Sequence, residues 1–353
     1  MVLTSVFFGD ELTGLETALT DQRLDKLTEW LKYVLDQNEI DISVASADAS
    51  FRRYFRVQTP DNISGKSWIV MDAPPDKEDC KPFVKVSTAF HHVKMNVPEI
   101  YAQDLSQGFL VLTDFGSTSY LDKLNDQTAD KLYGDAMDAL VNLQTNEKPK
   151  NMTLPLYDDA LLKQEMNLFS EWFLARHLQV AIDANTEKML ADTFQQLSEM
   201  ALQQPVVWVH RDYHSRNLMI TEKNNPGVID FQDAVDGPIT YDLVSLLRDC
   251  YISWPDEKVA AWVKFYLQKL QDKNCCIDVS EQQFIKWFDW MGLQRHIKVL
   301  GIFSRLNYRD GKSGYLSDIP LTLDYVVKVA SRYSELAEFS QYMSKIKLPE
   351  RVS

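Results

Sequence analysis

Apolar residues recur at helical spacing near the beginning of the chain. Over residues 13–38 the leucines, Trp30 and Val34 fall on one broad face, which predicts an amphipathic helix. The period then shortens, and four short segments bounded by turn-forming residues are typical of strands: 42–45, 54–57, 67–71 and 109–112. A second helix is predicted over 79–95. This part of the chain is therefore expected to form a helix and a small antiparallel sheet.

Beyond about residue 118 the pattern is mostly helical. Seven segments have apolar residues at helical spacing: 128–144, 158–180, 185–203, 240–251, 256–273, 280–306 and 321–344. Short apolar runs interrupt them at 206–209, 217–220 and 227–229. The order predicts an α+β fold with an N-terminal lobe over 1–115 and a larger, mainly helical C-terminal lobe over 116–353. A ligand is expected in a cleft between two such lobes.

Composition and charge narrow the possible partners. The chain has 353 residues, 45% of them hydrophobic and 25% charged, as in ordinary globular proteins. At about 150 residues per domain, this length favours two domains. Lys and Arg number 37 against 51 for Asp and Glu, so the formal net charge is −14. Without a basic block the chain lacks the charge pattern that binds a phosphate backbone or an anionic membrane. We therefore expect neither nucleic acid nor membrane as a partner.

Cysteine usage and the first residues bear on the compartment. The cysteines are Cys80, Cys250, Cys275 and Cys276, which are too few for a disulfide scaffold and form no C-x-x-C pair. The first residues are mildly apolar but lack the basic start of a signal peptide. No run approaches about 18 consecutive apolar residues. These features predict reduced thiols in a cytoplasmic protein.

The strongest chemical signal runs from His210 to Asn217. The chain there reads H-R-D-Y-H-S-R-N and matches H-R-D-x-x-x-x-N, the catalytic loop of kinases. In that loop the aspartate, here Asp212, accepts the proton of the acceptor hydroxyl, and Asn217 turns back to bind a metal ion. A short apolar strand follows and ends at Asp230, where a second ligand would bridge Mg²⁺ to the triphosphate of ATP. The tripeptide alone is a weak signal, but the ordered set predicts an ATP- and Mg²⁺-dependent phosphotransferase.

The segment downstream of the loop points to a family. Residues 237–244 read G-P-I-T-Y-D-L-V and resemble the G-P-x-x-Y-D-L-A segment of the aminoglycoside phosphotransferase-like kinases. In that family the aspartate buttresses the catalytic loop, so the resemblance implies a structural role for Asp242. A carboxylate near a helix N-terminus is also favourable electrostatically. His210 and His214 lie in the loop without a third ligand nearby, so we expect His210 to be packed and to maintain the shape of the loop.

Further segments resemble one branch of that family. They cover 49–57, 70–75, 78–80, 247–255 and 308–320. Together they are similar to the bacterial anomeric sugar kinases that act on N-acetylmuramate and N-acetylglucosamine in peptidoglycan recycling. The resemblance runs from about residue 45 to residue 320. It implies a two-lobed protein-kinase-like fold, with a small antiparallel-sheet lobe and a larger helical lobe, and a small-molecule sugar acceptor.

A D-F-G tripeptide at Asp114 lies far upstream of the catalytic loop. In the kinase order, this position is the hinge after the last strand of the small lobe. We therefore interpret Leu112, Thr113, Asp114 and Phe115 as a hinge that contacts adenine through backbone groups. The alternative is a plain turn between domains.

Phosphate binding in the small lobe departs from the kinase pattern. There is no glycine-rich loop, and the family's G-x-S element is reduced to Ser50, which we carry over as a phosphate contact. The strand that should supply a phosphate-binding lysine, 68–72, contains none. One explanation is that Arg52, Arg53 or Arg56 replaces it, since a guanidinium can reach phosphates from the neighbouring strand; we favour Arg52. The other is that the chain is a pseudokinase.

Two positions are candidates for the acceptor side. Trp254 precedes a proline after a predicted helix and is a candidate sugar platform, with core packing as the alternative. Arg309 or Lys312, in a turn with Gly311, is a candidate partner for a lactyl carboxylate, with a charged surface turn as the alternative.

The sequence thus leads to one hypothesis and two alternatives. The hypothesis is phosphorylation of the anomeric hydroxyl of N-acetylmuramate and N-acetylglucosamine with ATP and Mg²⁺. The first alternative is an aminoglycoside or amino-alcohol (choline-type) kinase, since an acidic cleft would suit a cationic acceptor and the net charge of −14 does not exclude one. The second is a nucleotide-binding pseudokinase regulator. A protein kinase is disfavoured because no activation segment ending in A-P-E follows Asp230.

Overall fold

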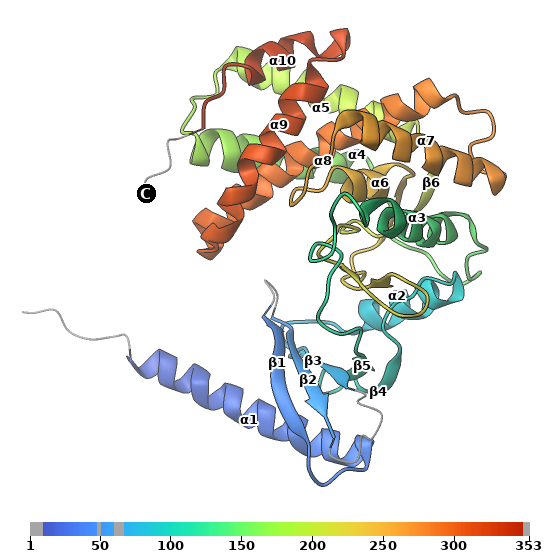
Figure 1. Cartoon of the computed structure of the whole chain (residues 1–353). Helices are drawn as coiled ribbons and strands as arrows, with labels where there is room; N and C mark the ends of the chain where they lie inside the picture. The colour runs from blue at the N-terminus through green and yellow to red at the C-terminus, as the bar shows by residue number, and fades with distance from the viewer. Residues whose placement is uncertain (1–9, 48–50, 60–66, 349–353) are drawn as a thin grey trace, which may run out of the picture. The chain divides into compact units, whose positions relative to one another are not determined.

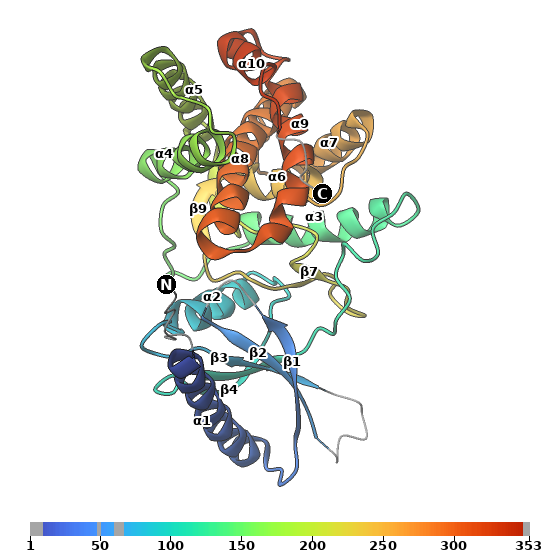
Figure 2. The same ribbon diagram turned by 90° about the vertical axis from the view of Figure 1, so that its left-hand side faces the viewer.

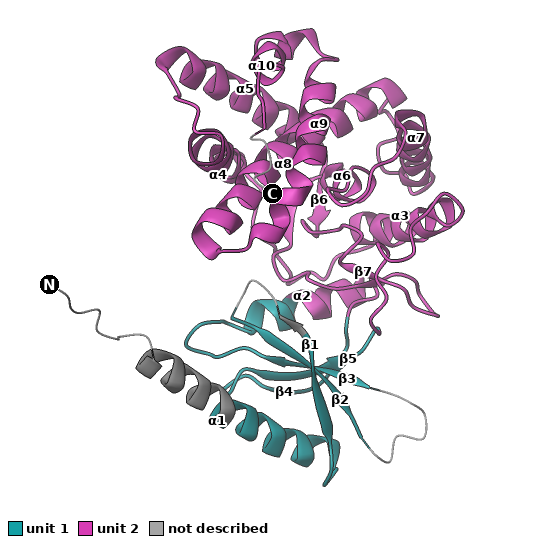
Figure 3. Ribbon diagram, turned by 60° about the vertical axis from the view of Figure 1, so that its left-hand side comes forward, with its two compact units in different colours: residues 1–85, 98–115 teal, residues 86–97, 116–353 magenta. Residues whose placement is uncertain are grey.

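The computed structural model of the chain has two compact units (Figure 3). It describes the following residues: 10–47, 51–59 and 67–348. Unit 1 comprises residues 1–85 and 98–115, and unit 2 comprises residues 86–97 and 116–353. The short segment 86–97 thus belongs to the second unit, although it lies within the first in sequence.

Unit 1 is built on one antiparallel sheet with the strand order β1-β2-β3-β5-β4 (Figure 1). Its strands are β1 (Asp41–Ala47), β2 (Arg53–Gln58), β3 (Trp68–Asp72), β4 (Ile100–Asp104) and β5 (Phe109–Thr113). One helix, α1 (Asp10–Leu35), accompanies them, and the boundary between the units falls within α2 (Lys81–His92). The strands predicted from the sequence are present, and β4 is an additional strand that was not predicted. It pairs only with β5 and has no fully buried position, so its apolar residues do not stand out from the polar ones.

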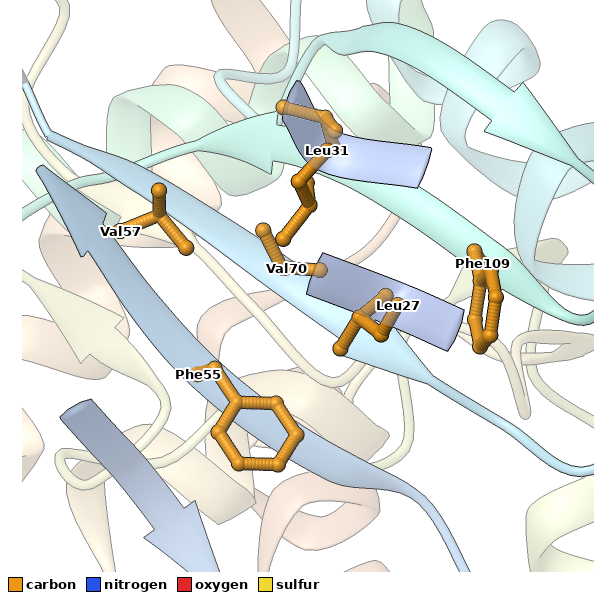
Figure 4. Close-up of a cluster of buried hydrophobic side chains, with 7 residues drawn as sticks. Leu27, Leu31, Phe55, Val57, Val70 and Phe109 are labelled. Carbon is orange, nitrogen blue, oxygen red and sulfur yellow. The ribbon is translucent and has the colours of Figure 1, made fainter. Parts of the chain in front are cut away.

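The apolar face of α1 packs on this sheet (Figure 4). Leu27 and Leu31 of α1 are fully buried, as the helical spacing predicts. They meet side chains that share one face of the central strands: Phe55, Val57, Val70, Phe109 and Val111. Burying each such side chain contributes about 1.5–3 kcal/mol. The alternation of Phe55 and Val57 along β2 is what places both of them on the helix side.

Unit 2 is mainly helical and surrounds one long helix (Figure 2). Its α-helices are α3 (Ala129–Thr145), α4 (Asp159–Leu168), α5 (Ala184–Leu202), α6 (Tyr241–Leu247), α7 (Asp256–Asp272), α8 (Glu281–Asp310), α9 (Ile319–Ala330) and α10 (Ala337–Met343). A π-helix, Phe169–His177, continues α4, and two short 3₁₀ turns, Ser313–Asp318 and Ser334–Leu336, flank α9. α8 is buried along most of its length because α4, α5, α6 and α9 pack around it.

Four short strands in unit 2 carry the predicted catalytic segment. They are β6 (Val206–Val209), β7 (Leu218–Met219), β8 (Gly227–Val228) and β9 (Val235–Pro238). β6 pairs with β9 and β7 pairs with β8, both antiparallel. β9 was not predicted because its sequence, V-D-G-P, has little strand propensity, and the strand depends on pairing with β6.

Two of the predicted helices differ in extent. The helix expected over 240–251 ends at Leu247, because Arg248 leaves the helical conformation with φ −120° and ψ 52°. The segment expected as one helix over 321–344 is divided between α9 and α10 by a turn at 331–332 and by Tyr333, whose backbone is extended.

In the part of the chain that the structure describes, no helix combines the length and the hydropathy needed to cross a bilayer.

Candidate active site

The predicted catalytic residues lie at the ends of the short strands of unit 2. The loop 210–217 connects β6 to β7, and Asp230 follows β8 by two residues. Because β7 pairs with β8, the two ends are adjacent: Nδ2 of Asn217 is 3.3 Å from Oδ2 of Asp230. The backbone N–H of Ile229 donates to the carbonyl of Asn217 at 3.1 Å and holds the two segments together. The hairpin thus joins residues that lie apart in sequence.

Asp212 lies half-buried in the same loop. Its backbone carbonyl accepts a hydrogen bond from Nδ2 of Asn217 at 3.0 Å. Burial alone would raise the pKa of the Asp212 carboxyl, but the positive charges of Lys298 and Arg295, together with His214, outweigh it and the pKa lies below its ordinary value. Asp212 is therefore a carboxylate at neutral pH, the form that can accept a proton.

The backbone of the loop is held by Asp242, in the first turn of α6. This fully buried carboxyl accepts the N–H of His210 at 2.7 Å and the N–H of Arg211 at 3.0 Å. Burial raises the pKa of Asp242 to about 7, with the nearby charge of Asp212 acting in the same direction. The structure therefore brings Asp242 against the catalytic loop, where the resemblance expects it.

His210 is also fully buried and connects the loop with the strand before Asp230. Its Nδ1 accepts the backbone N–H of Asp212 at 3.2 Å, and its Nε2 lies 3.0 Å from the carbonyl of Ile229. This pattern assigns the proton to Nε2, because Nδ1 must be an acceptor and the carbonyl needs a donor. Burial lowers the pKa of His210 to about 4, so the ring is neutral at pH 7.

Two residues of the site have left-handed backbone. Arg211 has φ 77° and Asp230 has φ 63°. Residues other than glycine seldom adopt this conformation, and it persists where the surroundings hold it in place. One of these residues precedes Asp212 and the other is the expected metal ligand, so two backbone positions of the site are in a conformation that the surrounding structure must stabilise.

The side chains of Asn217 and Asp230 fit a magnesium ion. Amide and carboxylate oxygens are the ligands that Mg²⁺ prefers, and Mg²⁺ usually keeps waters and substrate phosphates as its other ligands. The described residues contain no group of three or more His, Cys, Asp or Glu side chains that would enclose a metal by itself. Nε2 of Gln232 donates to Oδ1 of Asp230 at 2.7 Å and orients the carboxylate. The donor set therefore suits an ion shared with a nucleotide.

Sequence reasoning missed several residues that support the loop. Asp249, after α6, is 1% exposed and accepts hydrogen bonds from both the N–H and the hydroxyl of Ser215. Glu165 on α4 pairs with Arg211, and Lys298 on α8 pairs with Glu165. Asp249 lies within a segment that resembles the family, which was the available signal for it. Glu165 and Lys298 lie on helices far away in sequence, and nothing in their local pattern marks them.

The residues interpreted as an adenine hinge lie at the end of β5. Leu112 is buried and pairs with Ile69 of β3, and Thr113 is the last residue of β5. The carboxylate of Asp114 accepts hydrogen bonds from Nε of Arg56 and from Oγ of Ser67, each at 2.6 Å. Phe115 is the last residue of unit 1. The carboxylate of Asp114 therefore has hydrogen-bond partners within unit 1.

The arginines considered for phosphate binding are all paired with carboxylates. Nη2 of Arg52 lies 3.2 Å from Oε2 of Glu78. Arg53 pairs with the fully buried Asp72, and Arg56 pairs with Asp114 as described. The expected phosphate contact at Ser50 lies outside the residues that the structure describes.

The two acceptor-side candidates have different surroundings. Nε1 of Trp254 donates to the hydroxyl of Tyr133 at 2.9 Å, and Nζ of Lys258 lies 4.6 Å from the centre of its ring. Trp254 is thus part of an aromatic cluster of unit 2. Arg309 lies in the exposed last turn of α8 and pairs with its neighbour Asp310.

Comparison with known proteins identifies the family of this chain. Residues 41–275 match the model of the phosphotransferase enzyme family. The chain is 42% identical over 341 residues to an N-acetylmuramate/N-acetylglucosamine kinase of Pseudomonas putida, covering 94% of this chain and 98% of that one. It is 44% identical to the enzyme of the same name from Neisseria meningitidis, covering 90% and 93%. These matches confirm the resemblance found in the sequence.

Solved structures of low sequence identity share the fold. An ADP-bound aminoglycoside phosphotransferase has a TM-score of 0.57 at 15% identity, covering 86% of this chain and 98% of that one. An ethanolamine kinase of Plasmodium vivax has a TM-score of 0.57 at 13% identity, covering 83% of each chain. The predicted α+β, protein-kinase-like fold is thereby confirmed. The chain, with its H-R-D loop on the β6–β7 connection, belongs to the phosphotransferase enzyme family.

Proposed function

We propose that this protein is an ATP-dependent kinase that phosphorylates the anomeric hydroxyl of N-acetylmuramate and N-acetylglucosamine. The observation that carries the proposal is the cluster of Asn217 and Asp230, at the ends of the β7–β8 hairpin, with Asp212 of the β6–β7 loop. The substrate class follows from the relatives, which bear this name and match nearly the whole chain.

Asp212 acts on the acceptor in this proposal. Its carboxylate binds the anomeric hydroxyl, orients its oxygen towards the γ-phosphate, and accepts the proton as the new oxygen–phosphorus bond forms. The bond between the γ-phosphorus and the bridging oxygen breaks in the same step, and ADP leaves. Catalysis of phosphoryl transfer consists mainly of positioning and of charge stabilisation. Asn217 and Asp230 would hold Mg²⁺, which when bound neutralises charge on the phosphates. His210 and Asp242 keep the loop backbone in the conformation that presents Asp212.

Residues 1–115 form the nucleotide-binding lobe in this proposal, and 116–353 form the catalytic and acceptor-binding lobe. Backbone groups of 112–115 contact the adenine, while Ser50 and Arg52 contact the phosphates. The ion pair of Arg52 with Glu78 supports the choice of Arg52, because protein kinases hold their phosphate-binding lysine with a glutamate in the same way. Sugar contacts by Trp254 and Arg309 remain predictions.

The product would be a sugar 1-phosphate, which retains the N-acetyl group and has no free anomeric hydroxyl. Such a product can enter nucleotide-sugar synthesis, so we place the reaction in the recycling of peptidoglycan sugars. Since the reaction consumes ATP, we expect it in the cytoplasm.

ADP release by the purified protein with ATP and Mg²⁺ tests the proposal, with N-acetylmuramate, N-acetylglucosamine, kanamycin and choline as acceptors in parallel. Turnover confined to the two N-acetyl sugars is the expected result. Turnover on kanamycin or choline instead would establish an aminoglycoside or amino-alcohol kinase. ATP binding without turnover on any acceptor would favour the pseudokinase alternative.

A further inference from the structure

A buried carboxylate on α4 connects the catalytic loop with α8. Glu165 is 6% exposed, and its Oε1 accepts hydrogen bonds from the guanidinium of Arg211 and from Nζ of Lys298, the latter at 2.9 Å. Its Oε2 accepts the hydroxyl of Tyr157. Nζ of Lys298 also donates to the hydroxyl of Tyr241 at 3.1 Å. We refer to Glu165, Arg211, Lys298, Tyr157 and Tyr241 as the Glu165 network.

The Glu165 network, together with the adjacent Asp242, contacts the catalytic loop at two points, the side chain and the backbone of Arg211. Tyr241 begins α6 and directly precedes Asp242, whose carboxyl accepts the backbone N–H of Arg211. Arg211 is therefore held twice, through its side chain by Glu165 and through its backbone by Asp242. Glu165, Tyr241 and Lys298 come from α4, α6 and α8, and Tyr157 lies two residues before α4. The position of Arg211 therefore depends on the packing of several elements at once.

The Glu165 network contains buried charges, and burying a charge is energetically unfavourable. Burial opposes the charge on Glu165, but Lys298 and Arg211 outweigh it, so its pKa lies below the ordinary value and the group is ionised. Two cations and one carboxylate leave one net positive charge beside Asp212. Buried ion pairs add little to stability compared with apolar packing of the same volume. Stability alone is therefore a weak reason for this arrangement.

The backbone of Arg211 suggests a different reason. Its φ of 77° lies in the left-handed region, which a side chain such as arginine adopts only where the surroundings enforce it. The next residue is Asp212, so the direction of the Asp212 side chain depends on this peptide. A small rotation there would move the carboxylate away from the acceptor hydroxyl.

We propose that the Glu165 network is a positioning device for catalysis, which holds the guanidinium of Arg211 and thereby maintains the left-handed backbone that aims Asp212. The inference rests on the proposed function, since it takes Asp212 as the group that binds the acceptor hydroxyl. The five members are positioning residues, because they act through Asp212 and not on the reacting atoms.

Two variants and a matched control test this proposal. Glu165→Gln removes the negative charge at nearly constant shape, and Tyr241→Phe removes only the hydroxyl that links Lys298 to α6. Lys163→Met, on the same helix as Glu165, removes a half-exposed ion pair with Asp159 and serves as the control. For each protein we would measure kcat, KM for ATP and for the sugar, thermal unfolding, and amide hydrogen exchange of the loop 210–217.

Displacement of a catalytic group by about 1 Å can lower a rate about 100-fold. We therefore expect Glu165→Gln to lower kcat by about 10- to 100-fold while KM for ATP stays unchanged, and to speed exchange in the loop. Tyr241→Phe should have smaller effects in the same directions. The control Lys163→Met should match the wild type in kcat and in the hydrogen exchange of the loop.

Three results would overturn the positioning role. They are unchanged loop exchange in Glu165→Gln, faster exchange with wild-type kcat, and a loss of rate that only follows the fraction of unfolded protein. If the wild type released no ADP with any acceptor, the proposed function would fail. The exchange measurement would still decide whether the Glu165 network holds the loop.

Discussion

Replacing His210 by leucine is expected to loosen the catalytic loop and the strand before Asp230 together. Leucine has a similar volume but lacks both ring nitrogens, so the N–H of Asp212 and the carbonyl of Ile229 lose their partners. Each buried polar group left without a hydrogen bond costs about 1–3 kcal/mol. The free energy of unfolding should therefore fall by about 2–6 kcal/mol at pH 7.

The same side chain makes stability depend on pH. The pKa of His210 is about 4 in the folded protein against an ordinary value of 6.5. Between these values the unfolded chain binds a proton that the folded protein does not bind. The stability contributed by neutral His210 is thus complete above pH 6.5 and is lost as the pH falls towards 4. The difference between 6.5 and about 4 corresponds to about 3 kcal/mol.

Urea unfolding between pH 4 and pH 7.5 measures this contribution. Buried His296, whose pKa is lowered to about 3, adds a similar dependence, so the quantity to compare is the difference between wild type and His210→Leu. That difference should shrink by about 3 kcal/mol as the pH falls from 6.5 to 4. The variant of an exposed histidine, His92→Leu, should follow the wild type. An equal loss of stability in wild type and His210→Leu over this range would refute the reasoning.

Three further predictions follow from single contacts. Because burial raises the pKa of Asp242 to about 7 from 3.8, the folded protein keeps a proton that the unfolded chain releases near pH 4, and this group makes stability fall as the pH rises from 4 to 7. Asp242→Asn should remove that part of the fall in urea unfolding. An unchanged pH profile in the variant would contradict the raised pKa of Asp242. A Cβ at Gly301 would lie 2.4 Å from the carbonyl carbon of Leu168, so Gly301→Ala should shift α8 and lower stability by about 1–3 kcal/mol, seen as a lower Tm. Asp230→Asn should raise the Mg²⁺ concentration for half-maximal activity at least about tenfold, and an unchanged Mg²⁺ dependence would exclude Asp230 as a ligand.

The segment 210–217 could be recognised from the sequence because its residues follow one another closely along the chain. The segment 210–217 and the strand before Asp230 are each defined by a short local pattern of residues, which can be recognised without knowledge of the tertiary structure. The apolar spacing of α1 likewise predicts the face that covers the sheet, as burial of Leu27 and Leu31 confirms. Features that depend on residues close together in sequence could therefore be predicted from the sequence alone.

The supports of the loop could not be predicted in this way. Ser215 meets Asp249 across 34 positions, and Arg211 meets Glu165 across 46. Glu165 is one polar residue on an amphipathic helix, where surface exposure is the ordinary expectation, and only tertiary packing turns it inwards. β9 was missed for the same reason, since its residues become a strand through their pairing with β6.

The most direct test of the central claim compares the wild type with Asp212→Asn. Both proteins would be saturated with ATP and Mg²⁺, and transfer of phosphate to carbon 1 of N-acetylmuramate would be followed by phosphorus NMR, with ATP binding measured separately. The account predicts unchanged ATP binding and a loss of transfer of about 100- to 10,000-fold in Asp212→Asn. Near-normal transfer by that variant would contradict the role of Asp212.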